Sequence, residues 1–309
     1  MIRTAIVAIL ATVLAGPAVA QQSPEDSAEA PEQGFKVPPD AGQVPAWTLG
    51  SGRTLWLFPA GEVQPVYIAD LHRPMTAVMP QFYTRTGIYD STDLRTGLAV
   101  GGRFGIFRLD PATPGGRSWQ LSVDAGLNAQ FDSNNKLDNI GWDGKYGLSL
   151  TTATGGRLSF RVAILHDSAH IGDEYADRTG RTRIDYTREE FAFGVAVRVA
   201  RRLRAYAEGG YGYYLLTEEQ RPWRAHGGLE YTARRSLIGG RFAWYAAVDF
   251  SGTEEREWRL DTSVQTGITT TAGGRRWRIG VQYNDGAPPM GEFFQDTEAW
   301  FTVGLWIDM

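Results

Sequence analysis

Residues 241–250 read RFAWYAAVDF, and their polarity alternates with a period of two. The more apolar parity carries Phe242, Trp244, Ala246, Val248 and Phe250. The other parity carries Arg241, Ala243, Tyr245, Ala247 and Asp249. Successive side chains of a β-strand point to opposite faces, so this stretch predicts a strand with one apolar face and one more polar face.

A short signal of small residues and arginine recurs along the chain. It reads PGGR at 114–117, TGGR at 154–157, VARR at 199–202, TARR at 232–235 and AGGR at 272–275. The steps from Arg117 to Arg157, Arg201, Arg234 and Arg275 are 40, 44, 33 and 41 residues. Each step can hold two strands of roughly ten residues and one longer loop. Each step therefore predicts one β-hairpin, and the signal marks the tight turns.

Longer polar and mostly acidic segments lie between these turns: YDSTD, FDSNNKLDN, GDEYADRTGRTRIDY, TEEQRPW, GTEEREW and NDGAPPMGEFFQDTE. Together the loops and turns predict strands near 75–85, 94–109, 118–131, 139–152, 157–170, 186–199, 203–216, 223–233, 240–251, 257–270, 275–284 and 297–308. In outer-membrane barrels the short turns are periplasmic and the longer loops extracellular. The sequence thus predicts an all-β, transmembrane antiparallel β-barrel of about 12 strands with that orientation.

The composition agrees with a barrel. The chain has 37 Gly, 10 Trp, 13 Tyr and 14 Phe, yet its mean hydropathy is slightly polar. An apolar lipid face, a polar interior and aromatic rims together require such a mixture. The net charge of −4 argues against nucleic acid as a partner. The absence of cysteine excludes disulfides, a thiolate nucleophile, Cys-based metal sites and lipid attachment at an N-terminal cysteine.

The first residues predict export. Residues 1–20 contain Arg3, an apolar run and the small-residue ending Ala18-Val19-Ala20, which is typical of a signal peptide cut before Gln21. Residues 21–53 are rich in Pro, Ala, Glu and Gln and predict a disordered periplasmic leader.

The barrel domain is expected at 54–309. Its first part, 54–74, is interrupted by three prolines and is expected at the periplasmic end of the barrel. We expect the cell outer membrane of a Gram-negative bacterium as the location. Outer-membrane lipid and lipopolysaccharide are the expected partners, and the sequence names no protein partner.

Four stretches resemble a bacterial outer-membrane family known only as domain of unknown function 1207. They are LFPAGEVQPVYIADLHRP at 57–74, HDSAHIGDEY at 166–175, IDYTREE at 184–190 and PPMGEFF at 288–294. The resemblance covers most of the chain from about Thr54. It implies the barrel fold and the outer-membrane location, and it implies no activity.

The parity opposite the apolar one carries charges of both signs. The cations are Arg95, Arg103, Lys145, Arg161, Arg188, Arg198, Arg204, Arg224, Arg241, Arg259, Arg276 and Arg278. The anions are Asp124, Asp143, Asp167, Glu190, Glu208, Glu230, Asp249 and Asp261. Such a set predicts a salt-bridge network that closes the lumen, with His226 as a member. The alternative is a narrow ion-selective channel.

A polar row continues an apolar parity in the fifth predicted strand. Leu158, Phe160, Val162 and Ile164 are followed at the same spacing by His166, Ser168 and His170. The row is therefore expected on the lipid face, near the outer rim. Glu189 on the next predicted strand has nearly the height of His166.

A serine, a histidine and a carboxylate are the parts of an acyl-transfer site. Ser168 would be the nucleophile, His166 or His170 the base, and Glu189 the group that orients the imidazole. The His-x-Ser pattern resembles that of outer-membrane phospholipases and lipid A deacylases, which implies a lipid ester hydrolase. Those families usually carry Asn after the serine, where this chain has Ala169. The alternative interpretation is a row that only hydrogen-bonds lipid head groups.

Metal binding has few candidates. His166 and His170 are about 13 Å apart on a straight strand, too far to share an ion. Asp173, Glu174 and Asp177 are candidate calcium ligands, or ordinary solvated loop residues. No other cofactor is expected. His72 lies outside the predicted strands.

Overall fold

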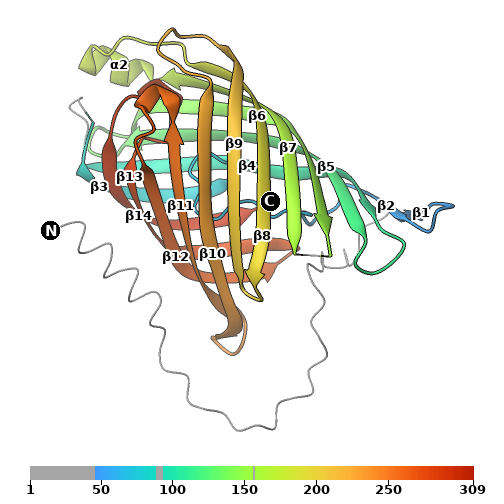
Figure 1. Ribbon diagram of the computed structural model, residues 1–309. Coiled ribbons are helices and arrows are strands. Elements are labelled where there is room, and N and C mark those ends of the chain that lie inside the picture. Colours follow the sequence, from blue (N-terminus) through green and yellow to red (C-terminus); the bar gives the residue numbers. More distant parts are fainter. Residues whose placement is uncertain (1–45, 88–92, 156) are drawn as a thin grey trace. The chain divides into compact units, whose positions relative to one another are not determined.

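The computed structural model describes residues 46–87, 93–155 and 157–309, which belong to one compact unit, residues 35–309. The predicted signal peptide 1–20, residues 21–45 of the predicted leader and most of the YDSTD loop lie outside the described residues. Within the described part, β-strands dominate, as Figure 1 shows.

Twelve strands of the described chain close into an antiparallel barrel. They are β3 (Thr76–Arg85), β4 (Leu94–Asp110), β5 (Arg117–Asp132), β6 (Asp138–Thr154), β7 (Leu158–Ile171), β8 (Thr187–Ala200), β9 (Leu203–Leu215), β10 (Trp223–Leu237), β11 (Phe242–Thr253), β12 (Asp261–Ala272), β13 (Arg275–Gly286) and β14 (Glu298–Asp308). Each strand pairs with its neighbours in chain order, and β14 pairs with β3. Closure leaves no free edge in the barrel wall formed by these twelve strands, as a lipid environment requires. The predicted fold class and strand number are confirmed.

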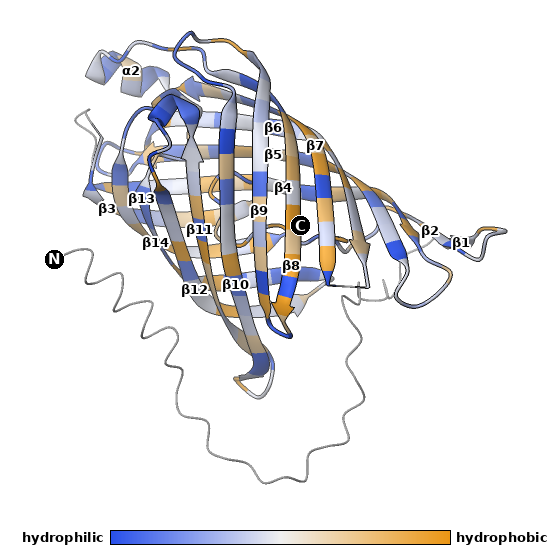
Figure 2. Cartoon of the chain, viewed as in Figure 1, coloured by the Kyte–Doolittle hydropathy of each residue, from blue (hydrophilic) through white to orange (hydrophobic). Residues whose placement is uncertain are grey.

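The predicted alternation is present along the wall. In β11, Ala243, Tyr245 and Ala247 are buried, whereas Phe250 is exposed. In β8 the large apolar residues Phe191 and Phe193 are about half exposed, at 50% and 55%. Figure 2 shows hydrophobic and hydrophilic residues alternating along the strands. An apolar outer face around a polar interior is the pattern of an outer-membrane barrel.

One predicted turn is wrong. TARR at 232–235 lies within β10, which continues to Leu237 through two irregularities in its pairing with β11. The turn is formed by IGGR at 238–241, where Ile238, Gly239 and Gly240 have φ angles of 50°, 67° and 76°. Two successive glycines adopt this left-handed region without steric cost, and a tight hairpin needs it. Arg241, predicted to face the interior, lies exposed in this turn.

The tenth strand begins later than predicted. A 3-10 helix, η1 (Glu254–Arg256), is followed by Glu257 and Trp258 with φ angles of 53° and 58°. Positive φ angles are incompatible with a strand, so β12 begins only at Asp261. Arg259, predicted to face the interior, lies in this loop and donates to Thr297 Oγ1 at 2.9 Å.

A hairpin of β1 (Ala46–Thr48) and β2 (Thr54–Leu57) extends the sheet beyond the barrel. β2 pairs with the last residues of β4, from Leu57 opposite Phe107 to Thr54 opposite Asp110. Residues 46–53, predicted as the end of the disordered leader, thus belong to a paired hairpin.

After β2, residues 58–75 enter the lumen, and we call them the inner segment. Arg204 of β9 donates to the carbonyl oxygens of Pro65 and Val66 at 2.8 and 2.9 Å. On β10, Glu230 Oε1 accepts the Ile68 N–H at 2.5 Å. These partners lie in the half of the barrel next to the short turns. The segment expected at the periplasmic end therefore occupies the interior of that half.

Loops cover the opposite, long-loop end. A short helix, α2 (Asp173–Thr179), and a 3-10 helix, η2 (Gly291–Phe293), share an apolar cluster of Ile140, Ile171, Tyr175, Met290 and Phe293. Arg181 pairs with Asp296 at 3.0 Å, and Arg256 donates to the Phe294 carbonyl oxygen at 2.9 Å. Among the described residues, no helix is long and apolar enough to cross a membrane.

Candidate functional site

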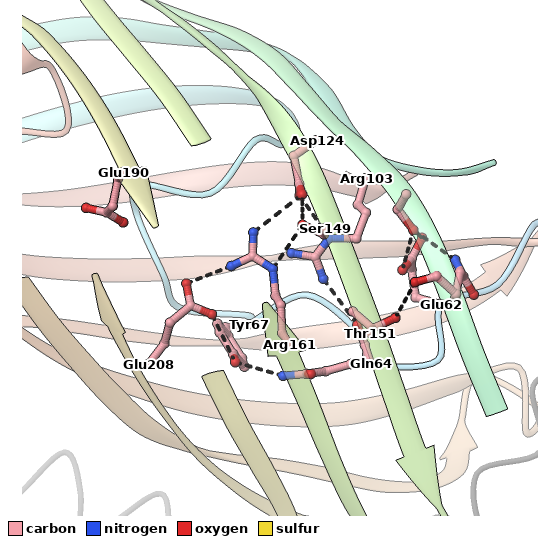
Figure 3. A network of polar contacts seen from close by, with 12 residues as sticks. Glu62, Gln64, Tyr67, Arg103, Asp124, Ser149, Thr151, Arg161, Glu190 and Glu208 are labelled. Atoms are coloured by element: carbon pink, nitrogen blue, oxygen red, sulfur yellow. Dashed lines mark hydrogen bonds and ion pairs between the residues drawn. The ribbon is translucent and has the colours of Figure 1, made fainter. Parts of the chain in front are cut away.

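Most of the charges predicted inside the barrel form a network, part of which is drawn in Figure 3. Asp124 accepts from Arg103 at 2.8 Å and pairs with Arg161 at 3.4 Å. Arg161 also donates to Glu208 at 2.7 Å, and Tyr67 of the inner segment reaches the same carboxylate at 3.4 Å. The inner segment is thus tied to the network by its side chains as well as its backbone.

The network continues around the wall with alternating charge. Glu190 pairs with both Arg188 and Arg224, at 2.7 and 2.6 Å. His226 Nδ1 lies 3.0 Å from Asp249 Oδ2, which confirms its predicted place in the network. Further pairs are Lys145 with Asp167, Arg204 with Glu230, Arg276 and Arg278 with Asp308, and Arg95 with Glu298.

Two ionisable groups of the inner segment have pKa values far from their ordinary ones. Burial raises the pKa of the Glu62 carboxyl to about 8, although Arg103 opposes this. Burial, helped by the Lys145 ammonium, lowers the pKa of His72 to about 4. His72 donates its backbone N–H to Asp70 Oδ1 at 2.8 Å. Both groups are therefore held mainly uncharged near neutral pH.

A cavity of about 110 Å³ lies between the inner segment and the loop before β14. Its lining includes Asp70, His72, Arg188, Arg224, Met290 and Phe294. The guanidinium groups of Arg188 and Arg224 are already engaged by Glu190. The lumen thus offers a small, charge-balanced space.

The polar row lies on the outer face of the wall, as predicted. Across the β6–β7 pairing, His166, Ser168 and His170 stand opposite Tyr146, Gly144 and Trp142. Across the β7–β8 pairing, His166 stands opposite Glu189 and Ser168 opposite Thr187. Directly opposite residues on one face have Cβ atoms about 5 Å apart, so these groups are neighbours.

The structure brings His166 and Glu189 together. His166 Nδ1 lies 2.7 Å from Glu189 Oε1. The ring of Tyr146 stacks on the imidazole, with centroids 4.2 Å apart and an interplanar angle of 19°. Tyr213 of β9 donates to the other carboxylate oxygen, Oε2, at 3.4 Å. The imidazole is thus held from both neighbouring strands.

Ser168 and His170 are held differently. Ser168 Oγ donates to the Gly144 carbonyl oxygen at 3.5 Å, and no hydrogen bond joins it to a described imidazole. His170 is exposed, and its ring packs against that of Trp142 at an interplanar angle of 36°, with centroids 4.3 Å apart. Of the four predicted residues, His166 and Glu189 therefore form a direct contact, while Ser168 lies beside them.

The calcium candidates do not come together. Asp173 and Glu174 lie in the first turn of α2, and Asp173 forms an ion pair with Arg183. Asp177 lies further along the same helix. Across the described ranges, no three His, Asp or Glu side chains are arranged to hold a metal ion.

Sequence reasoning missed Tyr146, Tyr213 and Thr187 around the row. The parity of one strand shows which face a residue occupies, but only the register between strands shows its neighbours. The short turn that joins β6 to β7, residues 155–157, is the signal that could have given this register and found Tyr146.

Comparison with known proteins gives one family and several solved structures. The family model described as "Protein of unknown function (DUF1207)" matches residues 12–308. No curated protein matches the sequence significantly. Outer membrane phospholipase A from Escherichia coli is similar with a TM-score of 0.49 and 9% identity, over 76% of this chain and 90% of that one.

Two further structures are similar over comparable lengths. The NanC porin has a TM-score of 0.43 and 12% identity, over 75% of this chain and 99% of the porin. LpxR from Salmonella typhimurium has a TM-score of 0.36 and 11% identity, over 75% and 99% of the two chains. The assignment of the fold rests on the strand pairing itself.

Proposed function

We propose a function from the geometry of the site, because the chain belongs to the family described as Protein of unknown function (DUF1207), whose description names no activity. The proposed function is that of an outer-membrane ester hydrolase that acts on acyl esters of the surrounding lipid. Ser168 is the nucleophile, His166 the base and Glu189 the orienting carboxylate.

The observation that carries this proposal is the contact between His166 Nδ1 and Glu189 Oε1, at 2.7 Å. A carboxylate at this position fixes the tautomer in which Nδ1 carries the proton. Nε2 is then free to accept a proton from a hydroxyl, and the carboxylate stabilises the imidazolium that forms. A histidine that only contacted lipid head groups would not need this hydrogen bond to a carboxylate.

Ser168 lies two residues from His166 on the same face of β7. Residues two apart on one face of a strand have Cα atoms about 6.6 Å apart, within reach of an imidazole and a hydroxyl that turn toward each other. The present partner of Ser168 Oγ, the Gly144 carbonyl oxygen at 3.5 Å, is at the long limit of a hydrogen bond and holds the hydroxyl weakly. Catalytic hydrogen bonds commonly tighten only when substrate is bound.

The proposed reaction has two steps, acylation of Ser168 and hydrolysis of the acyl-serine. Ser168 Oγ forms a bond to the ester carbonyl carbon while its proton passes to His166 Nε2. The ester C–O bond then breaks, and the departing alkoxide takes that proton and leaves as the deacylated lipid. The water oxygen next bonds to the acyl carbon while a water proton passes to His166 Nε2. The acyl C–Oγ bond then breaks, the proton returns to Ser168 Oγ, and the fatty acid leaves.

The lumen supports a site on the outer face rather than a channel. The inner segment crosses one half of the barrel, loops cover the other end, and the charged groups between them are paired. Breaking such buried pairs costs about 3–5 kcal/mol each. We expect little steady conductance in planar bilayers, and large long-lived openings would instead favour the narrow ion-selective channel.

Export through the predicted signal peptide 1–20 would place this site in the outer membrane, with the short turns periplasmic. The polar row then lies toward the outer leaflet, next to phospholipid and lipopolysaccharide. These lipids are the partners that the proposal requires.

A covalent probe tests the nucleophile directly. An alkyl fluorophosphonate should attach to Ser168 Oγ with loss of fluoride, and peptide mass spectrometry should locate the adduct there. Ser236→Ala is a matched control, because Ser236 Oγ is exposed and also donates to a backbone carbonyl at 3.5 Å. Labelling should persist in Ser236→Ala and vanish in Ser168→Ala. An unlabelled Ser168 in the folded wild type would contradict the proposal.

A further inference from the structure

We infer that a slot over Gly144, between two pairs of contacting rings, holds a linear fatty acyl chain with its ester carbonyl at Ser168. This inference rests on the proposed function and deepens it. It names the substrate class as unbranched fatty acyl esters, and it makes Gly144 a specificity-determining residue.

The walls of the slot are two pairs of contacting rings on β6 and β7, one tilted and one stacked. Trp142 and His170 have centroids 4.3 Å apart, and Tyr146 and His166 have centroids 4.2 Å apart. Each pair joins residues that stand opposite each other in the register. The two pairs are four residues apart along the strands, which is about 13 Å. A hydrocarbon chain can therefore lie between them across the strands.

The floor of the slot is Gly144 together with Ser168, which stands opposite it. A Cβ atom added at Gly144 would lie 3.5 Å from Ser168 Oγ and 3.7 Å from Trp142 Cζ3. Apart from the adjoining residues of the chain, no other described atom would lie within 4 Å of it. The position is thus open toward the lipid, and the open volume adjoins the serine hydroxyl.

Neither conformation nor packing requires glycine at this position. Gly144 is absent from the described residues with positive φ, and an added Cβ would make only ordinary contacts. Glycine weakens a strand interior, and it often marks a site where another molecule approaches closely. The missing side chain leaves room for a ligand directly over Ser168.

The chemistry of the slot favours hydrocarbon. Both walls are aromatic, and Trp142 and Tyr146 are 37% and 57% exposed on a face that contacts lipid. None of the six residues carries a permanent positive charge, so the slot offers no fixed cation for a phosphate. A linear acyl chain packs against the rings of both walls, and a branched or cyclic acyl group fits less closely between them.

The test compares two probes on Ser168. Methyl fluorophosphonate needs no slot, whereas hexadecyl fluorophosphonate places its chain in it. Gly144→Val fills the slot next to the serine, and Gly144→Ala fills it less. A misplaced methyl group in an apolar site changes selectivity by about 10- to 200-fold. We expect Gly144→Val to slow labelling by the hexadecyl probe about tenfold or more relative to labelling by the methyl probe, and Gly144→Ala to change this ratio less.

The matched control is Gly209→Val on β9. Gly209 is exposed, and a Cβ there would meet only the Arg224 carbonyl oxygen, at 3.8 Å. This variant should label like the wild type with both probes. If Gly144→Val is labelled by the hexadecyl probe at the wild-type rate, the slot is wrong and the proposed function stands. If neither probe labels Ser168 in the wild type, the proposed function fails, and the inference fails with it.

Discussion

His166 and Glu189 face each other across β7 and β8, with 2.7 Å between Nδ1 and Oε1, on the outer face of the barrel wall. The residue next to His166, Asp167, points to the opposite face and pairs with Lys145 in the lumen. Neighbouring positions of one strand therefore serve two separate systems. The outer one has the parts of an acyl-transfer site, and the inner one holds the lumen together.

The two histidines of the row should differ in importance. His166→Ala should lower the kcat for fatty acid release by about 10²-fold or more, because it removes the base that Glu189 orients. His170→Ala should change kcat little, because His170 contacts Trp142 and not the carboxylate. Glu189→Gln should lower kcat as well, through the wrong imidazole tautomer. A larger loss in His170→Ala than in His166→Ala would assign the base to His170.

Arg204 should hold the inner segment in place. It donates to the carbonyl oxygens of Pro65 and Val66, so Arg204→Ala removes two hydrogen bonds from the segment. The chain has no cysteine, so Ala69→Cys supplies a single thiol at a fully buried position. Thiol labelling at position 69 should be slow, and Arg204→Ala should speed it about tenfold or more. Labelling of Ala69→Cys as fast as that of an exposed Ser236→Cys would show that the segment is not docked.

The stability of the docked segment should depend on pH through Glu62. Its pKa is raised to about 8 by burial, so the contribution of Glu62 is complete below its ordinary pKa and is lost as the pH rises through about 8. Glu62→Gln should therefore remove part of the alkaline loss in the free energy of unfolding, measured by urea titration between about pH 6 and pH 9. Identical alkaline slopes in the two proteins would contradict the buried environment of this carboxyl.

His72 should lower the stability of the docked segment toward acid pH, whereas Glu62 lowers it toward alkaline pH. Burial lowers its pKa to about 4, so its contribution is present above its ordinary pKa and is lost as the pH falls through about 4. His72→Gln should reduce the acid loss of stability and leave the alkaline side unchanged. The same urea titrations, extended to acid pH, check this.

Export and insertion should be visible in fractionation. The mature protein should begin at Gln21, fractionate with outer membranes, and migrate differently on gels with and without heating, because a closed barrel resists detergent until heated. N-terminal mass spectrometry and paired gels check these expectations. Recovery as a soluble, heat-insensitive protein would overturn the membrane location.

The barrel was predictable because its strands and tight turns are indicated by short stretches of sequence. Alternation in RFAWYAAVDF identified a half-buried strand, and the repeated turn signal identified the hairpins. The errors occurred where local patterns compete. TARR and IGGR lie within ten residues of each other, and only the strand pairing shows that the second forms the turn. Trp258 and Leu260 continued an apolar parity, but a 3-10 turn precedes β12.

The site was predictable in part. Parity placed His166, Ser168 and His170 on one face, and strand height brought Glu189 to the level of His166. The contacts of Tyr146 and Gly144 depend on the β6–β7 register, which neither strand specifies alone. The position of residues 58–75 depends on tertiary partners such as Arg204 and Glu230, so no local pattern indicates that this segment lies in the lumen.

The central claim is that Ser168 cleaves lipid esters, and the most direct measurement is fatty acid release from phospholipid or lipid A in detergent micelles. Wild-type protein should release fatty acid, with or without calcium. Ser168→Ala should abolish release while the barrel stays folded, because a surface substitution of this size changes stability by only about 0.5 kcal/mol. Release by the wild type no faster than by Ser168→Ala, for all of these lipids, would contradict the account and leave the row as a rim that only binds head groups.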